Sequence, residues 1–321
     1  MMTGVTAAGP VTLATDLASV QRVETVRPAM CGHNSLFVGQ IGDWTWDAVS
    51  VACDTDVLRA QDPSGAPTYL SFYYYRVRGG RRVHLRTPTF GDRITVTSRV
   101  FGFGSESVLT LHRIALGDDP DLRPIDPDEF YAAGDDDGRL YVENFNRWIT
   151  RAQRGSNEQL ARSSPVNFRH EHLPALPERY SPRLACHRAR TAGTFTDGAT
   201  RARQSLATAL TFEYSIDPSR DLNGVGLLYF AAYFSIVDSG LLRLWRELGR
   251  DDRSFLDRVV SDQRLCYLGN ADAGSVLRID VRHWRGGLGG ARETVDVVLR
   301  DNSTDRLLAV STLHLLSGGQ P

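Results

Sequence analysis

Two kinds of hydrophobic periodicity occur along this chain, one typical of helices and one typical of strands. In residues 35–53, apolar side chains recur near helical spacing, so we predict a helix that begins at Asn34 or Ser35. Both residue types are good helix N-caps. Strands are predicted in the first half over residues 20–28, 69–77 and 84–114, the last of which is divided in two by a Gly-rich bend at FGFGS.

The second half of the chain repeats this order of elements. Residues 223–248, NGVGLLYFAAYFSIVDSGLLRLWREL, predict a second long helix that begins near Asn223. The stretches CGHNSLFVGQIG and NGVGLLYFAAYF, where the predicted helices begin, both hold an Asn in a small polar cluster and continue into apolar residues with Gly and aromatics. Strands are predicted in the second half over residues 211–216, 264–270, 274–301 and 307–316.

Each half therefore predicts one strand, one long helix and then several antiparallel strands. This order is typical of an α+β layer in which a long central helix is wrapped by a curved antiparallel sheet. The pattern resembles the hotdog fold, and two copies in one chain make a double hotdog. We place the N-terminal hotdog domain at residues 1–162 and the C-terminal one at residues 163–321, and we expect the functional site at the seam between them.

Composition narrows the class of protein further. The 321 residues carry a net charge of −1, which gives no electrostatic argument for binding nucleic acid, and all 37 basic side chains are arginine. No apolar stretch approaches the ~18 residues of a membrane span, and residues 1–20 look like a loose leader without the pattern of a signal peptide. The 4 cysteines lack metal-type spacing. We therefore expect a cytoplasmic protein with no membrane contact and no bound metal, and a homodimer stays open.

Two pairs of segments resemble a known enzyme family. RPAMCGHNSLFVGQIGDWTW with PTYLSFYYYRVRGG, and DLNGVGLLYFAAYFSIVD with RLCYLGN, are similar to the leinamycin-type bifunctional acyltransferase/decarboxylase family of polyketide biosynthesis, over nearly the whole chain. The resemblance implies that methylmalonyl-CoA is the substrate and that its acyl group is transferred through a tyrosine. Decarboxylation and delivery of propionyl to an acyl carrier protein would follow. The coenzyme A thioester is then the substrate, and no separate cofactor is expected.

The start of the first predicted helix is one candidate for the site. If Asn34 or Ser35 opens that helix, the free backbone N–H groups of its first turn can bind an anion. Such donors stabilise the oxyanion that forms from a thioester carbonyl, and the side chains of His33 and Asn34 add further donors. The alternative is that Asn34 only caps the helix and that His33 has an ordinary hydrogen-bond partner in a tight turn.

The aromatic strand YLSFYYY is the second candidate. Alternation puts Tyr69, Ser71, Tyr73 and Tyr75 on one face of the strand. A phenol has a pKa near 10, so it attacks a thioester only when a base or positive charge lowers that pKa. We predict Tyr69, at the start of the strand beside Thr68, as the nucleophile, with Tyr73 as the second candidate. The alternative for each tyrosine is ordinary core packing, since aromatic residues favour strands.

Substrate-binding positions are predicted in both halves, and in the first half they include Ser35 and Thr68 beside the two candidates above. Asn223 and Gly224 precede the second helix, where glycine allows the backbone to approach a ligand closely, although tight packing explains it equally well. Arg81 and Arg82 in GGRR, and the turn RGGLGG at residues 285–290, could meet the phosphates of coenzyme A. Solvated hairpin turns are the alternative for both arginine-containing stretches.

Three other functions stay open on the sequence. Polyketide dehydratases are also double hotdogs and resemble HxxxGxxxxP in one half and DxxxQ or DxxxH in the other. Here Gly39 follows His33 by six residues, the proline is missing, and Asp238 in DSGLL is followed by neither Gln nor His. We therefore expect a solvated or capping role for Asp238. A thioesterase and a binding protein without catalytic activity are the remaining alternatives.

Overall fold

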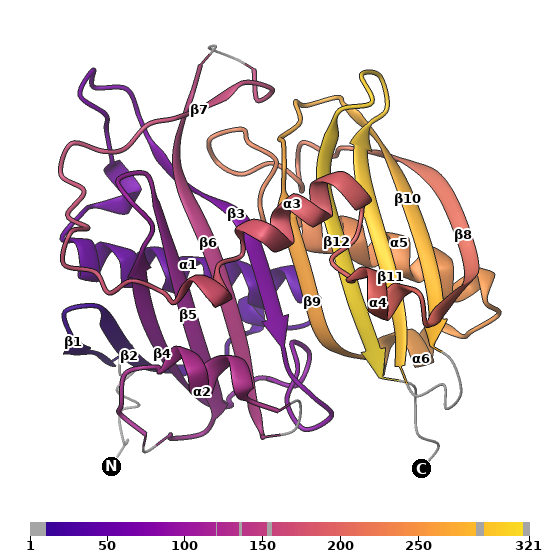
Figure 1. The fold of residues 1–321 in the computed structure, drawn as a ribbon, viewed down its shortest axis with the longest axis horizontal. Coiled ribbons are helices and arrows are strands. Elements are labelled where there is room, and N and C mark those ends of the chain that lie inside the picture. The colour runs from indigo at the N-terminus through magenta and orange to yellow at the C-terminus, as the bar shows by residue number, and fades with distance from the viewer. Residues whose placement is uncertain (1–10, 120, 135–136, 153–155, 287–291, 317–321) are drawn as a thin grey trace, which may run out of the picture.

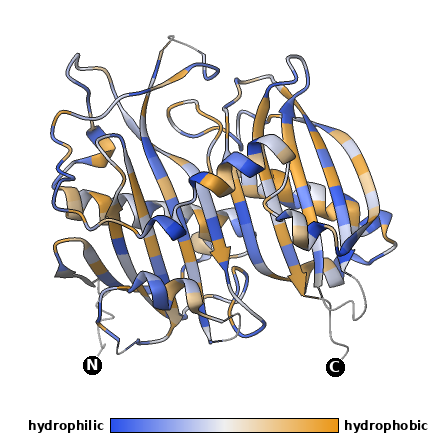
Figure 2. Cartoon of the chain, viewed as in Figure 1, coloured by the Kyte–Doolittle hydropathy of each residue, from blue (hydrophilic) through white to orange (hydrophobic). Residues whose placement is uncertain are grey.

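One continuous antiparallel sheet runs through the whole molecule. The computed structural model describes residues 11–119, 121–134, 137–152, 156–286 and 292–316. Within these residues the sheet has 12 strands, and both long helices, α1 (Asn34–Cys53) and α5 (Ala232–Glu247), lie on the same face of it (Figure 1). The main hydrophobic core fills the space between these helices and the sheet. Figure 2 shows the alternation of hydrophobic and hydrophilic residues along the strands that builds this core.

The first half contributes one block of neighbouring strands. Their order across the sheet is β2-β4-β5-β6-β3, with β1 beyond β2 and the short β7 paired to β6. The bounds of these strands are β1 (Val11–Asp16), β2 (Ser19–Thr25), β3 (Tyr69–Arg78), β4 (Arg93–Gly102), β5 (Ser107–Leu116), β6 (Arg139–Arg151) and β7 (Leu160–Arg162).

The second half contributes a block with the same topology. Its order is β8-β10-β11-β12-β9, and α5 follows β8 in sequence just as α1 follows β2. The predicted double hotdog and its internal repeat are therefore confirmed, whereas the boundary between residues 162 and 163 stays a prediction. The bounds are β8 (Gln204–Ser215), β9 (Val259–Tyr267), β10 (Val276–Gly286), β11 (Arg292–Asp301) and β12 (Leu307–Leu316).

The two blocks join through antiparallel pairing of β3 with β9. The paired positions run from Tyr74 opposite Cys266 to Arg78 opposite Asp262. A bidentate ion pair between Arg76 and Asp262, with atoms 2.7–3.0 Å apart, ties the strands together at this joint. Before Tyr74, β3 no longer pairs with β9, so the strands leave an opening at the seam.

The structure corrects two predicted boundaries. The expected leader contains strand β1, so it is not loose over its whole length. Helix α1 begins at Asn34 as predicted, but α5 begins at Ala232 rather than near Asn223. The side chain of Asn223 accepts hydrogen bonds from the backbone N–H groups of Val225 and Leu227, and Gly226 has a φ of +75°. These features close a tight loop ahead of the helix, because a positive φ suits glycine and ends helical geometry.

The opposite face of the sheet is covered by the segment that connects the two halves. Cys186, Ala189 and Phe195 from this segment pack against both blocks of strands, so the connection also helps to hold the halves together. No helix in the described ranges is long and apolar enough to cross a membrane. The shorter helices are η1 (Pro28–Met30), η2 (Val57–Arg59), α2 (Pro127–Ala132), η3 (Glu178–Tyr180), α3 (Arg183–Ala192), α4 (Gly198–Arg201) and α6 (Asp252–Leu256).

Candidate functional site

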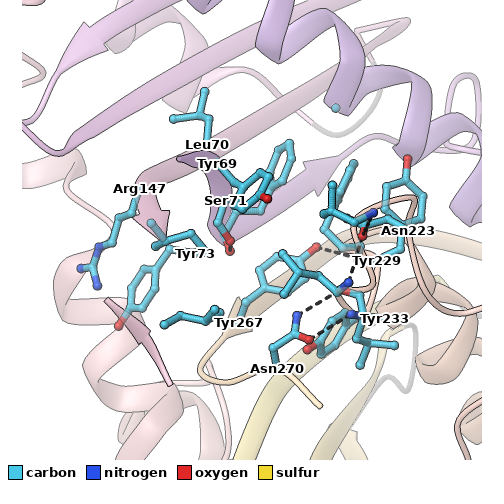
Figure 3. A pocket seen from close by; sticks show the side chains of 18 of the residues that line it. Tyr69, Leu70, Ser71, Tyr73, Arg147, Asn223, Tyr229, Tyr233, Tyr267 and Asn270 are labelled. Carbon is cyan, nitrogen blue, oxygen red and sulfur yellow. Dashed lines mark hydrogen bonds between the residues drawn. The ribbon is translucent and has the colours of Figure 1, made fainter. Parts of the chain in front are cut away.

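A pocket of about 610 Å³ lies at the seam where β3 and β9 cease to pair. Both halves of the chain form its walls, and Figure 3 shows the side chains of the two halves facing each other across it. The first half contributes Gly42, Tyr69, Ser71, Tyr73 and Arg147. The second half contributes Asn223, Gly224, Tyr229, Phe230, Tyr267 and Asn270.

The first wall is the start of strand β3, where the strand contains a bulge. Phe72 pairs with Asn146 and Tyr74 pairs with Phe145, so Tyr73 has no partner opposite it on β6. Because of this bulge, the predicted alternation fails at Tyr75, which lies in the core with Phe72 at a ring separation of 5.7 Å. Burial raises the pKa of Tyr75 well above its ordinary value. Tyr69, Ser71 and Tyr73 line one pocket together with Leu70 and Phe72.

Tyr73 lies against an arginine that the sequence analysis did not identify. The guanidinium carbon of Arg147, on β6, is 3.6 Å from the centre of the Tyr73 ring. Burial and the nearby Cys266 and Cys186 raise the pKa of Tyr73, and the positive charges of Arg147 and Arg190 only partly oppose them. The phenol of Tyr73 therefore stays protonated at neutral pH.

The second wall is the loop ahead of α5. The Oδ1 atom of Asn223 accepts the two loop N–H groups at 3.1 and 3.0 Å, which fixes the amide. Its Nδ2 group donates no hydrogen bond within the described residues, so it is a free donor on the pocket wall. Asn157 holds the loop by donating to the Gly226 carbonyl at 2.7 Å, and Asn270 exchanges hydrogen bonds with the backbone of Leu228 at 2.9 and 3.1 Å. The loop is thus anchored from both halves.

The predicted residues at the start of α1 lie elsewhere. Asn34 donates to Asp238 at 3.0 Å, and the Ser35 hydroxyl meets that of Ser235 at 2.8 Å, so this end of α1 packs against α5. His33 contacts the Ser35 hydroxyl at 2.6 Å. None of His33, Asn34 and Ser35 lines the seam pocket. Gly42, which does, lies eight residues farther along α1, about 12 Å at 1.5 Å per residue.

Asp238 has firmer partners than the sequence suggested. Besides Asn34, it forms an ion pair with Arg258 at 2.8 Å. The guanidinium of Arg258 is almost fully buried, with 2% of its side chain exposed. A carboxylate that is held in this way is not free to act as the base of a dehydratase.

The remaining predicted binding residues do not reach the pocket either. Arg81 and Arg82 are exposed and follow the far end of β3, which is about 30 Å from Tyr69 at 3.3 Å per residue. Thr68 is buried and does not line the pocket. In the turn at residues 285–290, positions 287–290 lie outside the described residues. Among the residues that are described, no group of three or more His, Cys, Asp or Glu could hold a metal ion.

The fold and the seam pocket define the class of this protein as a double hotdog. The chain belongs to the family of the LnmK N-terminal hot dog fold domain, whose family model matches residues 21–197. This result confirms the leinamycin-type resemblance at the level of the family. Among curated proteins, no sequence matches this chain at a significant level.

Solved structures support the fold. The 12:0-ACP thioesterase from Umbellularia californica is 12% identical with a TM-score of 0.56, and the match covers 94% of this chain and 95% of that one. A Lactobacillus plantarum protein described as a putative oleoyl thioesterase is 11% identical with a TM-score of 0.58, covering 94% of this chain and 98% of that one. At these identities the likeness establishes the architecture of the chain.

Proposed function

We propose that this protein converts methylmalonyl-CoA and an acyl carrier protein into propionyl-carrier protein, carbon dioxide and coenzyme A. The family relationship supports a thioester substrate of this kind. The observation that carries the proposal is that the side chains of Tyr69 and Ser71 line the same seam pocket as the free Nδ2 group of Asn223. Hydroxyl and amide donors of this kind can stabilise the oxygen of a thioester as it becomes an oxyanion or an enolate.

We assign acyl transfer to Tyr69 rather than to Tyr73. Burial raises the pKa of Tyr73, which suits a protonated donor better than a nucleophile. In the first step the Tyr69 oxygen bonds to the thioester carbonyl carbon, the C–S bond breaks, and the phenol proton passes to the leaving thiolate. In the last step the carrier thiol attacks the tyrosyl ester, its proton returns to the Tyr69 oxygen, and the acyl group leaves on the carrier.

Decarboxylation requires a different feature of the same pocket. The C–C bond to the carboxylate breaks, carbon dioxide leaves, and the resulting enolate takes one proton to give the propionyl group. Apolar walls favour this step because they solvate the carboxylate poorly, and the stacked rings of Phe72 and Phe230, 4.0 Å apart, provide such a wall. The Asn223 amide is the donor that we assign to the enolate oxygen.

Incubation with methylmalonyl-CoA tests the proposal. Mass spectrometry of the wild-type protein should detect an acyl group on Tyr69, together with carbon dioxide and propionyl-carrier protein when the carrier is added. Tyr69→Phe should lose transfer to the carrier by about 10² or more, the scale seen when one directly acting group is removed. It should still release carbon dioxide, because enolate stabilisation does not need that oxygen.

Tyr73→Phe is the matched control, since it removes the same atom from the same strand. If it abolishes the protein-bound acyl group while Tyr69→Phe retains it, the assignment of the nucleophile is reversed. Full transfer in both variants would exclude a tyrosine mechanism.

Hydrolysis is the competing activity, because both structural relatives named above are described as thioesterases. A thioesterase needs only a positioned water in place of the carrier thiol. Release of free methylmalonate or propionate from the thioester, with no acyl-protein and no dependence on the carrier, would favour it. Absence of any turnover with binding intact would favour a binding protein.

A further inference from the structure

A second, polar space adjoins the seam pocket. It has a volume of about 320 Å³ and lies beside the turn that connects β4 to β5. Arg147 and Arg162 line both spaces, and Arg183 lines the second one. A ligand that fills the seam pocket can therefore extend into this second space, which is lined mainly by polar and charged groups.

The arginines around this continuation are poorly neutralised. Arg147 is half-buried, and burial lowers its pKa, yet it has no carboxylate within ion-pair distance in the described chain. Arg183 and Arg190 likewise have no ion pair among the described residues. By contrast, Arg162 has a carboxylate partner in Glu106 at 3.6 Å. Burying a cation without a counter-charge is costly, so the half-buried Arg147 favours an anionic ligand, and the exposed Arg183 and Arg190 add positive charge around the two spaces.

Helix α3 presents two of these arginines on one face. Arg183, His187 and Arg190 follow each other at helical spacings of four and three residues, so their side chains share a face. The adjacent face carries Cys186 and Ala189, which are buried against the sheet. Arg183 lines the polar space and Arg190 lines the seam pocket, so α3 borders both spaces. Figure 1 shows α3 lying across the sheet where the two blocks of strands meet.

We propose that Arg147, Arg183 and Arg190 form a subsite for the phosphoryl group at the end of a pantetheine thioester. This inference rests on the proposed function, because it assumes a thioester whose acyl end lies beside Tyr69. Planar guanidinium groups match phosphate oxygens in paired hydrogen bonds, and three cations can neutralise the one or two negative charges that this phosphoryl group carries. Coenzyme A and a loaded carrier protein both contain this phosphoryl group, so one subsite serves the acyl donor and the acyl acceptor in turn.

Calorimetry with three unreactive ligands tests the subsite. Pantetheine, 4′-phosphopantetheine and coenzyme A are titrated into the wild-type protein and into Arg183→Gln/Arg190→Gln. Both residues are exposed, so the fold should be retained. We expect the double variant to bind phosphopantetheine and coenzyme A about tenfold or more weakly, the scale of a charge-assisted hydrogen bond. Its affinity for pantetheine should be unchanged. Higher salt should reduce this difference.

Arg188→Gln is the matched control. It removes the same charge from the same helix, but Arg188 lines neither space, so its affinities should equal those of the wild type. An equal loss for pantetheine would overturn phosphate recognition, and a loss confined to coenzyme A would shift the contact to the adenosine 3′-phosphate. No loss for any ligand would also overturn the proposal.

A second arm distinguishes the phosphoryl group from the carrier protein itself. Phosphopantetheine-loaded and unloaded carrier are compared in the same variants. A loss that is equal for both carriers and absent for free phosphopantetheine would identify a protein docking surface and would overturn the subsite. If the wild type binds pantetheine but the arginines have no effect, only the subsite fails. If it binds none of the three ligands, the proposed function fails as well.

Discussion

Gly42→Ala is the change for which the structure makes the sharpest stability prediction. Gly42 lies inside α1, where alanine would ordinarily stabilise a helix by about 1 kcal/mol. A Cβ atom at this position would lie 2.1 Å from the Cζ atom of Phe230, far closer than two carbons approach. The Phe230 ring cannot simply swing away, because it stacks on Phe72 with ring centres 4.0 Å apart.

The size of the effect follows from these two opposing contributions. Inserting a methyl group into a packed site costs about 1–3 kcal/mol, which exceeds the helix-propensity gain. The net result should be a destabilisation of about 1 kcal/mol. Gly240→Ala is the matched control in α5, where the nearest contact of the added Cβ atom would be 3.2 Å from Val281. There a shift of a few tenths of an ångström suffices, so the propensity gain should balance or exceed the cost.

Urea titrations of the wild type and the variants measure these differences as free energies of unfolding. A double-mutant cycle adds the specific test. Gly42→Ala should cost less in a Phe230→Leu background than in the wild type, since the smaller side chain leaves room for the methyl group. If Gly42→Ala instead stabilises the protein by about 1 kcal/mol and shows no coupling to Phe230, the loop ahead of α5 does not lie on α1 as described.

Two further predictions concern buried charges and pH. Burial would raise the pKa of Asp262, but Arg76 and Arg264 outweigh it and hold this pKa well below its ordinary value, so Asp262→Asn should cost about 3 kcal/mol at pH 7. This contribution is fully present above the unfolded pKa near 3.8 and is lost progressively as pH falls from there through the lower folded pKa. The free energies of unfolding of wild type and variant should therefore converge over this range, and a gap that stays constant through it would contradict the reasoning. Burial lowers the pKa of His112 from 6.5 to about 3, so unfolding takes up a proton at any pH between these values. The free energy of unfolding should therefore decrease by about 1.4 kcal/mol for each unit by which the pH falls within this range. His112→Gln should remove that slope in urea titrations at pH 6.5 and 5.0; equal slopes would mean that folded His112 is already protonated.

The order of elements could be predicted because it depends on local periodicity and was present twice. Helix α1 begins at Asn34 as predicted, and most of the alternating strands were recognised, although β1 and β6 of the first half were not. The pairing of β3 with β9 joins residues that are nearly 200 positions apart, for example Arg76 and Arg264, and it brings Arg76 to the carboxylate of Asp262. No local pattern specifies such a register, so this ion pair could not be foreseen.

The candidate site was predictable only in part, for similar reasons. The tyrosine strand was found from its composition, but the bulge at Tyr73 changes which face Tyr75 occupies, and a single extra residue leaves no periodic signal. Asn223 was noted as a helix start, yet it reaches the pocket because it closes a loop. Arg147 was missed, since the strand NFNRW that carries it was not predicted and an isolated arginine has no motif.

The repeated topology explains why a duplicated chain has one spacious site. Because β3 and β9 pair antiparallel, a seam between two equivalent halves has two equivalent ends. One end is the pocket beside Tyr69. The other, lined by Asn34, Val77 and Arg258 among others, encloses only about 10 Å³. There Asn34 and Arg258 both bond Asp238, so polar groups that could have served a second site satisfy one another. Because this end of the seam is closed, the second half does not need a tyrosine wall of its own. Its Asn223 loop instead lines the pocket at the opposite end of the seam.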